Sequence, residues 1–492
     1  MKKILIGLTV ASLALTSCGE WLDINYDPNS PTAGVVDNNM ILPASEMALS
    51  AKYGDFFRIA GGYFAQHYSQ MFGTENYLDY SRFTMSATRS SSSYSTIMAN
   101  SIANASVVRE KATEAEEWGT YLAATCIRVF GYQALVDAYG EIPYTEGQDP
   151  SILNPTYDDG ATVYAGLVEE LDEALSKVSE TDIVATNFLY AGQNASNWIK
   201  FANALKLKIL MRESGVANVS SQLAALVAEN NFPTADVAWK NIWANESGKA
   251  NPFYQEEFAT YFGSTQINVA LNVALYRAMS DYDDARMGAF FSPNSSDGSY
   301  VGGISGTNFT GSSNYSANSF CRPAAHYDDP VYLISKAEIE FFLAEYYAGA
   351  GNNAQAQAHY EAAIRASFET AGVSGAEAAI AAWPFDAQNV QKCIGVQKWI
   401  ALSGINSFEA WCEMRRLGYP RFGGLSASDI YSDDNIDASV LTPGELYTPV
   451  SCDAQVGANA TIQRWPYALS SSSYNSNAPA NKSLSDKVFW AK

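Results

Sequence analysis

Apolar residues recur at steps of three and four along much of this 492-residue sequence, which is the spacing of amphipathic helices. One such segment begins at Trp118 and ends before Gly140, a residue type that often terminates helices. A second covers residues 163–178, after the N-cap candidates TYDD at 156–159, and a third covers 198–211. Successive amphipathic helices joined by short turns form hairpins, which must stack to bury their apolar faces.

Residues 331–372 contain the clearest helical hairpin. Gly349 and Gly351 separate two helical segments, and Ala358 and Ala362 provide small side chains where two helices pack closely. This pattern resembles the second helix of a tetratricopeptide repeat. We therefore predict a mainly α fold, in which tetratricopeptide-like helical hairpins form a superhelical scaffold.

Two tracts, 290–320 and 421–482, lack this periodicity and are rich in Gly, Ser and Asn. Long loops inside a compact domain are usually functional or disordered, and the aromatic residues of the first tract favour order. We predict a signal peptide at 1–17 followed by one domain over 18–492, with a loop-rich irregular region packed on the scaffold. The predicted scaffold lies mainly in 40–213 and 330–420, and the loop-rich parts are 214–330 and 421–492.

The N-terminal segment predicts export and a lipid anchor. Lys2 and Lys3 precede a twelve-residue apolar run from Ile4 to Leu15, which is too short to span a membrane because a spanning helix needs ~20 residues. The Leu-Thr-Ser junction before Cys18 resembles the cleavage site of a bacterial lipoprotein, whose new N-terminal cysteine is acylated. Several acyl chains on Cys18 would anchor the protein stably. An ordinary signal peptide that leaves Cys18 free is the alternative.

The acidic composition argues against binding to nucleic acid. The chain has 30 Lys and Arg against 52 Asp and Glu, a formal net charge of −22, so it cannot neutralise phosphates over an extended surface. Five cysteines follow Cys18, far apart and without a CxxC pair, so we expect neither a zinc site nor a disulfide framework. They are Cys126, Cys321, Cys393, Cys412 and Cys452.

No catalytic motif is found in the sequence. The three histidines are isolated from one another: His67, His326 and His359. There is no HExxH, GxSxG or P-loop motif. The adjacent acids Asp283-Asp284 and Asp328-Asp329 fit turn or cap roles better than the pair of a glycosidase. We predict a protein that is not an enzyme and needs no cofactor; the alternative is a surface glycoside hydrolase whose acids are distant in sequence.

An acidic loop at 426–439 contains Asp429, Asp433, Asp434 and Asp437. Carboxylates at short intervals could hold Ca²⁺, but the loop lacks the glycine and terminal glutamate of an EF-hand. The sequence favours a solvated loop over a metal site.

Aromatic and amide side chains are the best candidates for ligand contact. A neutral sugar has C–H faces that stack on aromatic rings and hydroxyls that pair with amides, carboxylates or guanidinium groups. Such residues gather in 71–83, in 239–262 and in the loop around residue 315. The candidates are Asn76, Tyr77, Tyr80, Arg82, Trp243, Asn245, Tyr254, Phe258 and Tyr315. For each of them the alternative is packing in the core or between loops.

Four longer motifs resemble the SusD/RagB family, and its SusD-like branch in particular. They are VFGYQALVDAYGEIPYTEG (129–147), NWIKFANALKLKILMRES (197–214), QKWIALSGINSFEAWCEMRRLGYP (397–420) and QRWPYALSSSSYNSN (463–477). The last departs from the family pattern, which more often has Pro and an acidic residue soon after the equivalent of Tyr467. The motif residues fit structural roles: Phe408, Trp411 and Met414 share one helix face, and Arg415 and Arg416 suit the negative end of that helix.

The resemblance implies a function that spacing and composition do not. It implies a lipoprotein on the outer face of a Gram-negative outer membrane, partnered with a SusC-like TonB-dependent transporter. Its ligand would be a nutrient, usually an oligosaccharide. Some members serve peptide uptake, so a peptide-binding uptake lipoprotein is an alternative, as is a structural envelope protein.

Overall fold

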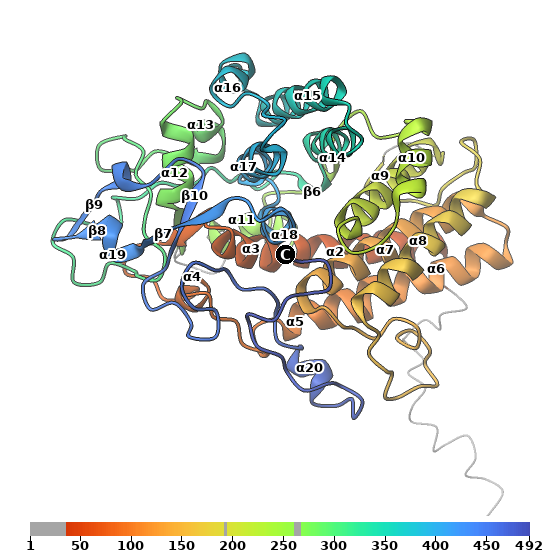
Figure 1. Ribbon diagram of the computed structural model, residues 1–492. Helices are drawn as coiled ribbons and strands as arrows, with labels where there is room; N and C mark the ends of the chain where they lie inside the picture. Colours follow the sequence, from red (N-terminus) through yellow and green to blue (C-terminus); the bar gives the residue numbers. More distant parts are fainter. Residues whose placement is uncertain (1–35, 191–193, 260–266) are drawn as a thin grey trace, which may run out of the picture.

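A computed structural model describes residues 36–190, 194–259 and 267–492 (Figure 1). The predicted signal peptide and Cys18 lie outside these residues. Within the described ranges, no helix has the length and apolar character needed to cross a membrane. The described part of the chain is mainly helical, and the strands found there form two-stranded pairs.

Successive helical hairpins form the scaffold, as the periodicity predicts. Helix α7 ends where the sequence indicates, at Gly140, which adopts a positive φ of 85°. Helix α8 is capped by Asp159, whose carboxylate accepts a hydrogen bond from the Thr162 N–H. The hairpin helices are α6 (Ala103–Glu114) with α7 (Trp118–Tyr139), α8 (Gly160–Lys177) with α9 (Ser196–Glu213), α14 (Lys336–Gly349) with α15 (Asn353–Ala371), and α17 (Val390–Leu402) with α18 (Ser407–Leu417).

The start of the 331–372 hairpin differs from the prediction. Residues Val331–Ile334 form strand β6, which pairs antiparallel with β2 (Val237–Trp239). Helix α14 begins only after Ser335, whose side chain forms a capping box with Glu338.

The remaining elements are short, apart from α2, and most connect or flank the hairpins. The region 214–330, which was predicted to be loop-rich, contains four short helices, α10 to α13, that the sequence did not predict. Within it, residues 293–321 contain no helix, as expected from their lack of periodicity. The other helices are α2 (Asn38–Lys52), α3 (Arg58–Phe64), α4 (Leu78–Ser81), α5 (Ser91–Ser95), α10 (Ser220–Glu229), α11 (Pro252–Glu257), α12 (Val273–Ser280), α13 (Arg286–Phe290), α16 (Ala376–Ala382), α19 (Ala427–Ile430) and α20 (Leu469–Ser472), with π-helical turns at Tyr53–Phe57 and Thr96–Ile102 and a 3₁₀ turn at Ala438–Val440. The antiparallel pairs are β1 (Tyr68–Gln70) with β3 (Val269–Leu271), β2 with β6, β4 (Phe291–Ser292) with β5 (Arg322–Pro323), and β8 (Tyr431–Ser432) with β9 (Asn435–Ile436); β7 (Arg421–Ser426) pairs parallel with β10 (Glu445–Thr448).

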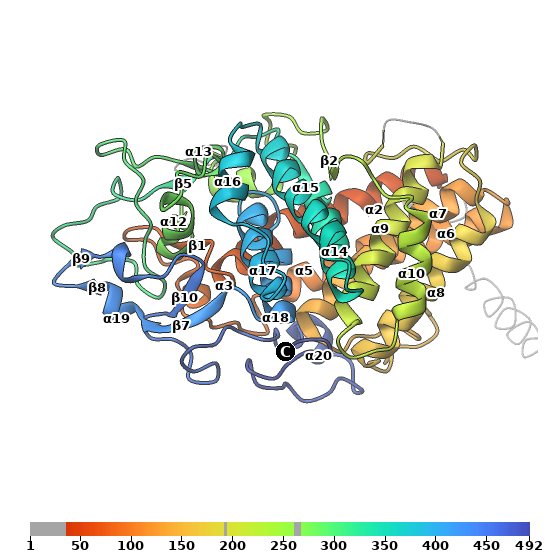
Figure 2. The same cartoon turned by 45° about the horizontal axis from the view of Figure 1, so that its top comes forward.

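The hairpins follow one another in space as they do in sequence. Helix α7 packs on α8 and α9, α9 on α14, and α17 on both α14 and α18. Figures 1 and 2 show α14, α15 and α17 between the α9–α10 side and the loop-bearing side that carries α12 and α13. Helix α18 closes on α3, where Gly61 is required because a Cβ there would lie 2.4 Å from the Phe408 Cα.

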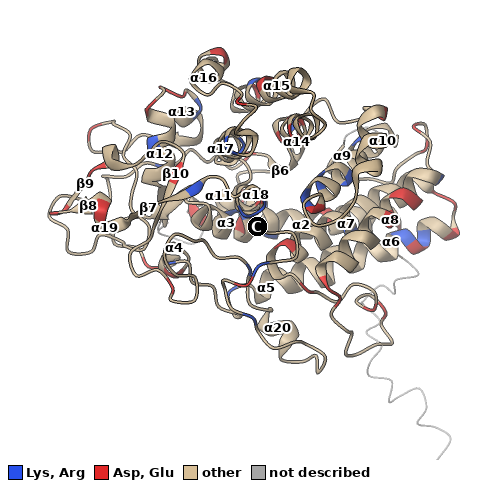
Figure 3. Ribbon diagram, in the orientation of Figure 1, with Lys and Arg blue, Asp and Glu red and all other residues tan. Residues whose placement is uncertain are grey.

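A buried charge network joins these helices, and Figure 3 shows basic residues on both α9 and α18. Arg212 of α9 is fully buried and contacts the carboxylates of Asp137, Glu409 and Glu413, the last at 2.9 Å from Nη2. Lys208, one turn earlier, lies 2.7 Å from Glu409. Because each of these buried ions has an opposite charge beside it, the network fixes how α7, α9 and α18 meet.

The family motifs meet in the core, which confirms their structural role. Phe408, Trp411 and Met414 are all buried, and Trp411 stacks on Trp465 with ring centroids 6.0 Å apart. The prediction for Arg415 was incomplete, because its guanidinium donates to the carbonyls of other segments, including Asp137 O at 2.9 Å. It therefore ties α18 to α7 in addition to lying at a helix end.

Candidate ligand-binding surface

The segment 71–83 is hydrogen-bonded to the two other stretches that contain predicted candidates, one at helix α11 and one in the loop that carries Tyr315. Tyr77 donates its hydroxyl hydrogen bond to Glu256 Oε1 at 2.9 Å, which links this segment to α11. The Gly73 N–H donates to Asn308 O at 2.8 Å, which links the segment to the loop at 293–321, called the central loop from here on. Hydrogen bonds therefore hold together three stretches that are far apart in the sequence.

Three aromatic side chains lie together beside this segment: Tyr254 and Phe258, which are half-buried, and Tyr327, which is exposed; we call them the aromatic ledge. Tyr254 and Phe258 stack with centroids 6.0 Å apart and an interplanar angle of 13°. Tyr327 lies edge-on to Tyr254 at 6.4 Å and is 36% exposed. Such half-buried rings on a rigid frame suit the apolar face of a sugar. Tyr254 and Phe258 were predicted from the sequence, and Tyr327 was not.

Tyr77 and Tyr80 lie beneath the surface. They are 6% and 1% exposed, and their rings stack on each other with centroids 5.6 Å apart. Burial, with Glu257 and Glu256 nearby, raises the pKa of Tyr77 well above its ordinary value. These two tyrosines occupy the packing role that was the alternative to ligand contact, and Tyr77 is linked to α11 through its hydrogen bond to Glu256.

The two polar candidates of this segment lie at its edges. Asn76 is exposed, and its carbonyl accepts a hydrogen bond from Arg89. Arg82 is half-buried, and its Nε donates to Gly306 O at 3.0 Å. Arg82 therefore fastens the segment to the central loop.

Trp243 and Asn245 lie in the stretch that precedes α11. Trp243 is half-buried against the core, and its indole N–H has no hydrogen-bond partner among the described residues. Asn245 is exposed in a turn that is closed by a hydrogen bond from the Ala244 N–H to Lys249 O at 2.8 Å.

Tyr315 belongs to a separate aromatic group. Its ring stacks on Phe320 at 5.2 Å and lies 5.3 Å from Phe309, and its hydroxyl accepts a hydrogen bond from the Ile436 N–H at 2.9 Å. These contacts join the central loop to the β8–β9 hairpin, so the hydroxyl and much of the ring are already engaged.

A cavity of about 350 Å³ lies next to the ledge, and we call it the Arg58 pocket. His326 and Asp329, which flank Tyr327 in sequence, line it together with Arg58 and Tyr332. Sequence reasoning missed this pocket because Arg58 is more than 260 residues from the other three, and no local pattern signals their proximity.

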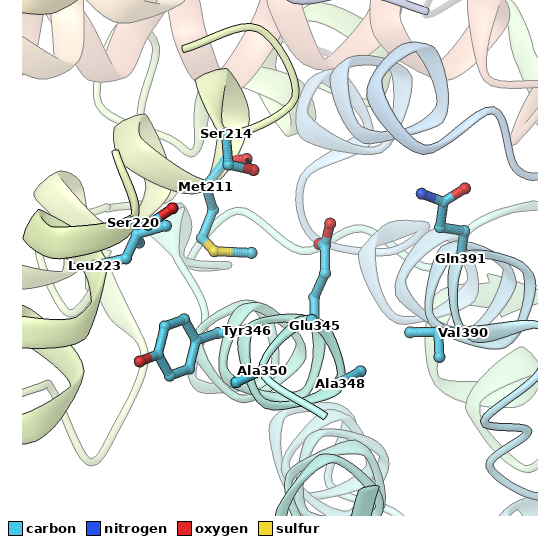
Figure 4. A pocket seen from close by; sticks show the side chains of 11 residues that line it. Met211, Ser214, Ser220, Leu223, Glu345, Tyr346, Ala348, Ala350, Val390 and Gln391 are labelled. Carbon is cyan, nitrogen blue, oxygen red and sulfur yellow. Dashed lines mark hydrogen bonds between the residues drawn. The ribbon is translucent and has the colours of Figure 1, made fainter. Parts of the chain in front are cut away.

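A second cavity, of about 560 Å³, lies between the ends of α9 and α10 and those of α14 and α17. Figure 4 shows Met211 and Glu345 facing its interior. Tyr346 is its single aromatic lining residue, and Glu345 is paired with Arg416 at 2.6 Å. This groove therefore offers less for sugar stacking than the ledge does.

Two of the three histidines, and Asp284 of the paired acids, have structural partners in the described chain. His67 is buried between Ser407 Oγ and Trp399 O, at 2.9 and 3.0 Å, and burial lowers its pKa to about 3. His359 lies 2.7 Å from Glu340, and Asp284 pairs with Arg286 at 2.6 Å.

In the acidic loop, Asp429 and Asp434 form hydrogen bonds within the protein. Asp429 completes a capping box at α19, and Asp434 accepts hydrogen bonds from Ser313 and Tyr431. In the part of the chain that the structure covers, no group of three or more His, Cys, Asp or Glu is arranged to hold a metal ion. All five cysteines there are free thiols.

The chain is therefore a mainly α-helical protein, of the class in which stacked helical hairpins form a scaffold and the segments between them carry an aromatic surface. Within that class the chain belongs to the SusD-like family described as "Starch-binding associating with outer membrane", whose match covers residues 43–438. The family resemblance noted in the sequence is thereby confirmed. No curated protein matches the chain.

Solved structures confirm the fold. A SusD homologue from Bacteroides uniformis is 23% identical with a TM-score of 0.70, and the match covers 94% of this chain and 100% of that one. A chitin-binding protein is 20% identical with a TM-score of 0.73, covering 92% and 100%. A SusD homologue from Bacteroides thetaiotaomicron is 19% identical with a TM-score of 0.70, covering 93% and 99%.

Proposed function

We propose that this protein is a cell-surface, non-catalytic subunit that binds a glycan and delivers it to a TonB-dependent transporter in the outer membrane. The family description supports a starch-like ligand and a place at that membrane. The observation that carries the proposal is the aromatic ledge, which the buried Tyr77 and the scaffold hold in place.

The ledge suits capture more than catalysis. A pyranose ring would lie on Tyr254 and Phe258, with Tyr327 against its edge. The exposed carboxylate of Glu256, which lies between Tyr254 and Phe258 in the sequence, can accept hydrogen bonds from the sugar hydroxyls. Stacking needs no activated group, and the histidines of the described chain are held in structural contacts or stand alone.

Calorimetry with malto- and chito-oligosaccharides of two to six residues tests the ligand. Wild-type protein should bind at least one series, and Tyr254→Ala and Tyr327→Ala should each weaken binding about 2- to 10-fold, because an aromatic contact is worth roughly 0.5–1.5 kcal/mol beyond its buried area. Tyr474→Ala is the matched control, since Tyr474 is 85% exposed and lies near α20. Absence of glycan binding would refute the proposal; binding to peptide digests would support the peptide alternative, and shortened oligosaccharides would reveal a hydrolase.

The membrane claims have their own test. Full-length protein should fractionate with outer membranes and co-purify with a large β-barrel transporter, and Cys18→Ser should release it into the soluble fraction. Membrane retention of that variant, or purification without any barrel partner, would contradict the lipid anchor or the transporter partnership respectively.

A further inference from the structure

The guanidinium of Arg58 is held rigidly at the wall of the cavity beside the ledge. It is 9% exposed and stacks over the Phe253 ring at 4.2 Å. Its Nη2 donates to Gly404 O at 2.8 Å, and its Nε lies 3.3 Å from the Tyr68 hydroxyl. These contacts leave Nη1 of Arg58 without a partner among the described residues. Because Arg58 lines the pocket, Nη1 can donate hydrogen bonds to a ligand bound there.

Two further polar groups line the same pocket. The Tyr332 hydroxyl has no hydrogen-bond partner in the described chain, and burial with Asp236 and Asp329 nearby raises its pKa, so it remains a donor at neutral pH. Asp329 uses Oδ2 to accept the His326 N–H at 2.8 Å, which leaves Oδ1 as an acceptor.

We infer that the Arg58 pocket is a subsite for one neutral sugar ring, adjacent to the ring that the ledge binds. This inference rests on the proposed function. A fixed cation and a carboxylate line the pocket together, so an anionic group would meet Asp329 and a cationic one would meet Arg58. A neutral polyol can bind to both groups, because each of its hydroxyls can accept a hydrogen bond from Arg58 or donate one to Asp329. The volume of about 350 Å³ lies near the lower end of the ~300–1,000 Å³ range of small-ligand sites.

Asn251 fixes the pocket and the ledge relative to each other. Its backbone N–H donates to Tyr327 O at 2.7 Å, and its side-chain amide donates to Asp329 O at 2.9 Å. The same residue caps α11, which carries Tyr254. A ligand that contacts both places therefore meets a preorganised frame, which reduces the ordering cost of binding.

Calorimetry with the same neutral oligosaccharides, and with oligogalacturonate as an anionic probe, tests the inference. Ala371→Leu places a larger apolar side chain at the pocket wall, and Tyr332→Phe removes one hydroxyl. Ala350→Leu makes the same change in the groove of Figure 4 and serves as the matched control. Both pocket variants should weaken binding of the longer neutral oligosaccharides at least threefold, with unchanged melting temperature, and the control should not.

Each result separates the two claims. If ledge variants weaken glycan binding and pocket variants leave the Kd unchanged, the subsite is refuted and the proposed function stands. Tighter, pocket-dependent binding of oligogalacturonate would refute the neutral class. Failure of wild-type protein to bind any of these glycans would refute both.

Discussion

Trp490 donates its indole N–H to Asp137 Oδ1 at 2.9 Å, which joins the last described turn of the chain to the C-terminal turn of α7. Tyr164 donates to the same oxygen at 2.5 Å, and Arg212 pairs with the other oxygen. One buried carboxylate thus links helices α7, α8 and α9 to the C-terminal segment.

Substitution Trp490→Phe should lower the free energy of unfolding by about 1.5–3 kcal/mol, because it removes a hydrogen bond to a charged group while keeping an aromatic ring. Chemical denaturation measures the change. Tyr474→Phe, at an exposed position in the same C-terminal region, should have no effect. Equal stability of Trp490→Phe and wild type would contradict the role given to this bond.

Substitution Arg212→Met should cost about 3–5 kcal/mol, because removing one partner of a buried ion network leaves Asp137, Glu409 and Glu413 without their shared cation. The comparison is Arg365→Met, since the Arg365 side chain is 46% exposed and pairs with Glu361 and Glu377; exposed pairs are worth at most about 1 kcal/mol. Similar losses for the two variants would contradict the network's role.

The buried carboxyl group of Glu46 should make the free energy of unfolding fall as the pH rises through about 8. Burial raises its pKa to about 8 from an ordinary 4.5, although it accepts the Phe188 N–H at 2.6 Å. Since the folded state holds the proton more tightly than the unfolded state, this stabilisation is complete below about pH 4.5 and is lost as the pH rises through about 8. Asp55, Glu213 and Glu257 have pKa values raised to about 7, so they contribute to the lower part of the same window.

The Glu46 contribution can be isolated above pH 7. Glu46→Gln should make stability fall less steeply between pH 7 and 8, by up to about 1.4 kcal/mol per pH unit. Denaturation midpoints across pH 5–9 for both proteins give the comparison. Parallel curves would show that Glu46 does not titrate in this range.

The sequence predicts the scaffold well because helix formation depends on local periodicity. The segment from Trp118 to Gly140 ends where a glycine can adopt positive φ, and both features are visible in the sequence. Residues 331–334 form a strand because they pair with β2, almost 100 residues earlier, and local spacing does not report such pairing.

The candidate site was less predictable, for a related reason. Tyr77 and Tyr254 occur in similar polar and aromatic surroundings in the sequence, yet one is buried and the other is half-exposed. Tyr77 contacts residues outside its own stretch, namely Tyr63 and, 179 residues away, Glu256. The Arg58 pocket forms because Arg58 lies beside a stretch more than 260 residues later, and no local sequence pattern predicts that contact.

Asp434 should control the order of the central loop without affecting the ledge. Its Oδ2 accepts the backbone N–H groups of Ser313 and Asn314 at 2.7 and 3.0 Å, and its Oδ1 accepts the Tyr431 hydroxyl at 2.7 Å. Hydrogen bonds from the side chains of Ser312 and Tyr431 and from Ser313 hold the pKa of Asp434 well below its ordinary value. Asp434→Ala should therefore increase amide hydrogen exchange in residues 312–315 and 431–436, with unchanged exchange around α11 and unchanged glycan affinity.

Asp433→Ala, which changes the adjacent acid, is the control. Unaltered exchange in Asp434→Ala would show that other contacts hold the loop, and a loss of glycan affinity would mean that the Tyr315 group belongs to the binding surface.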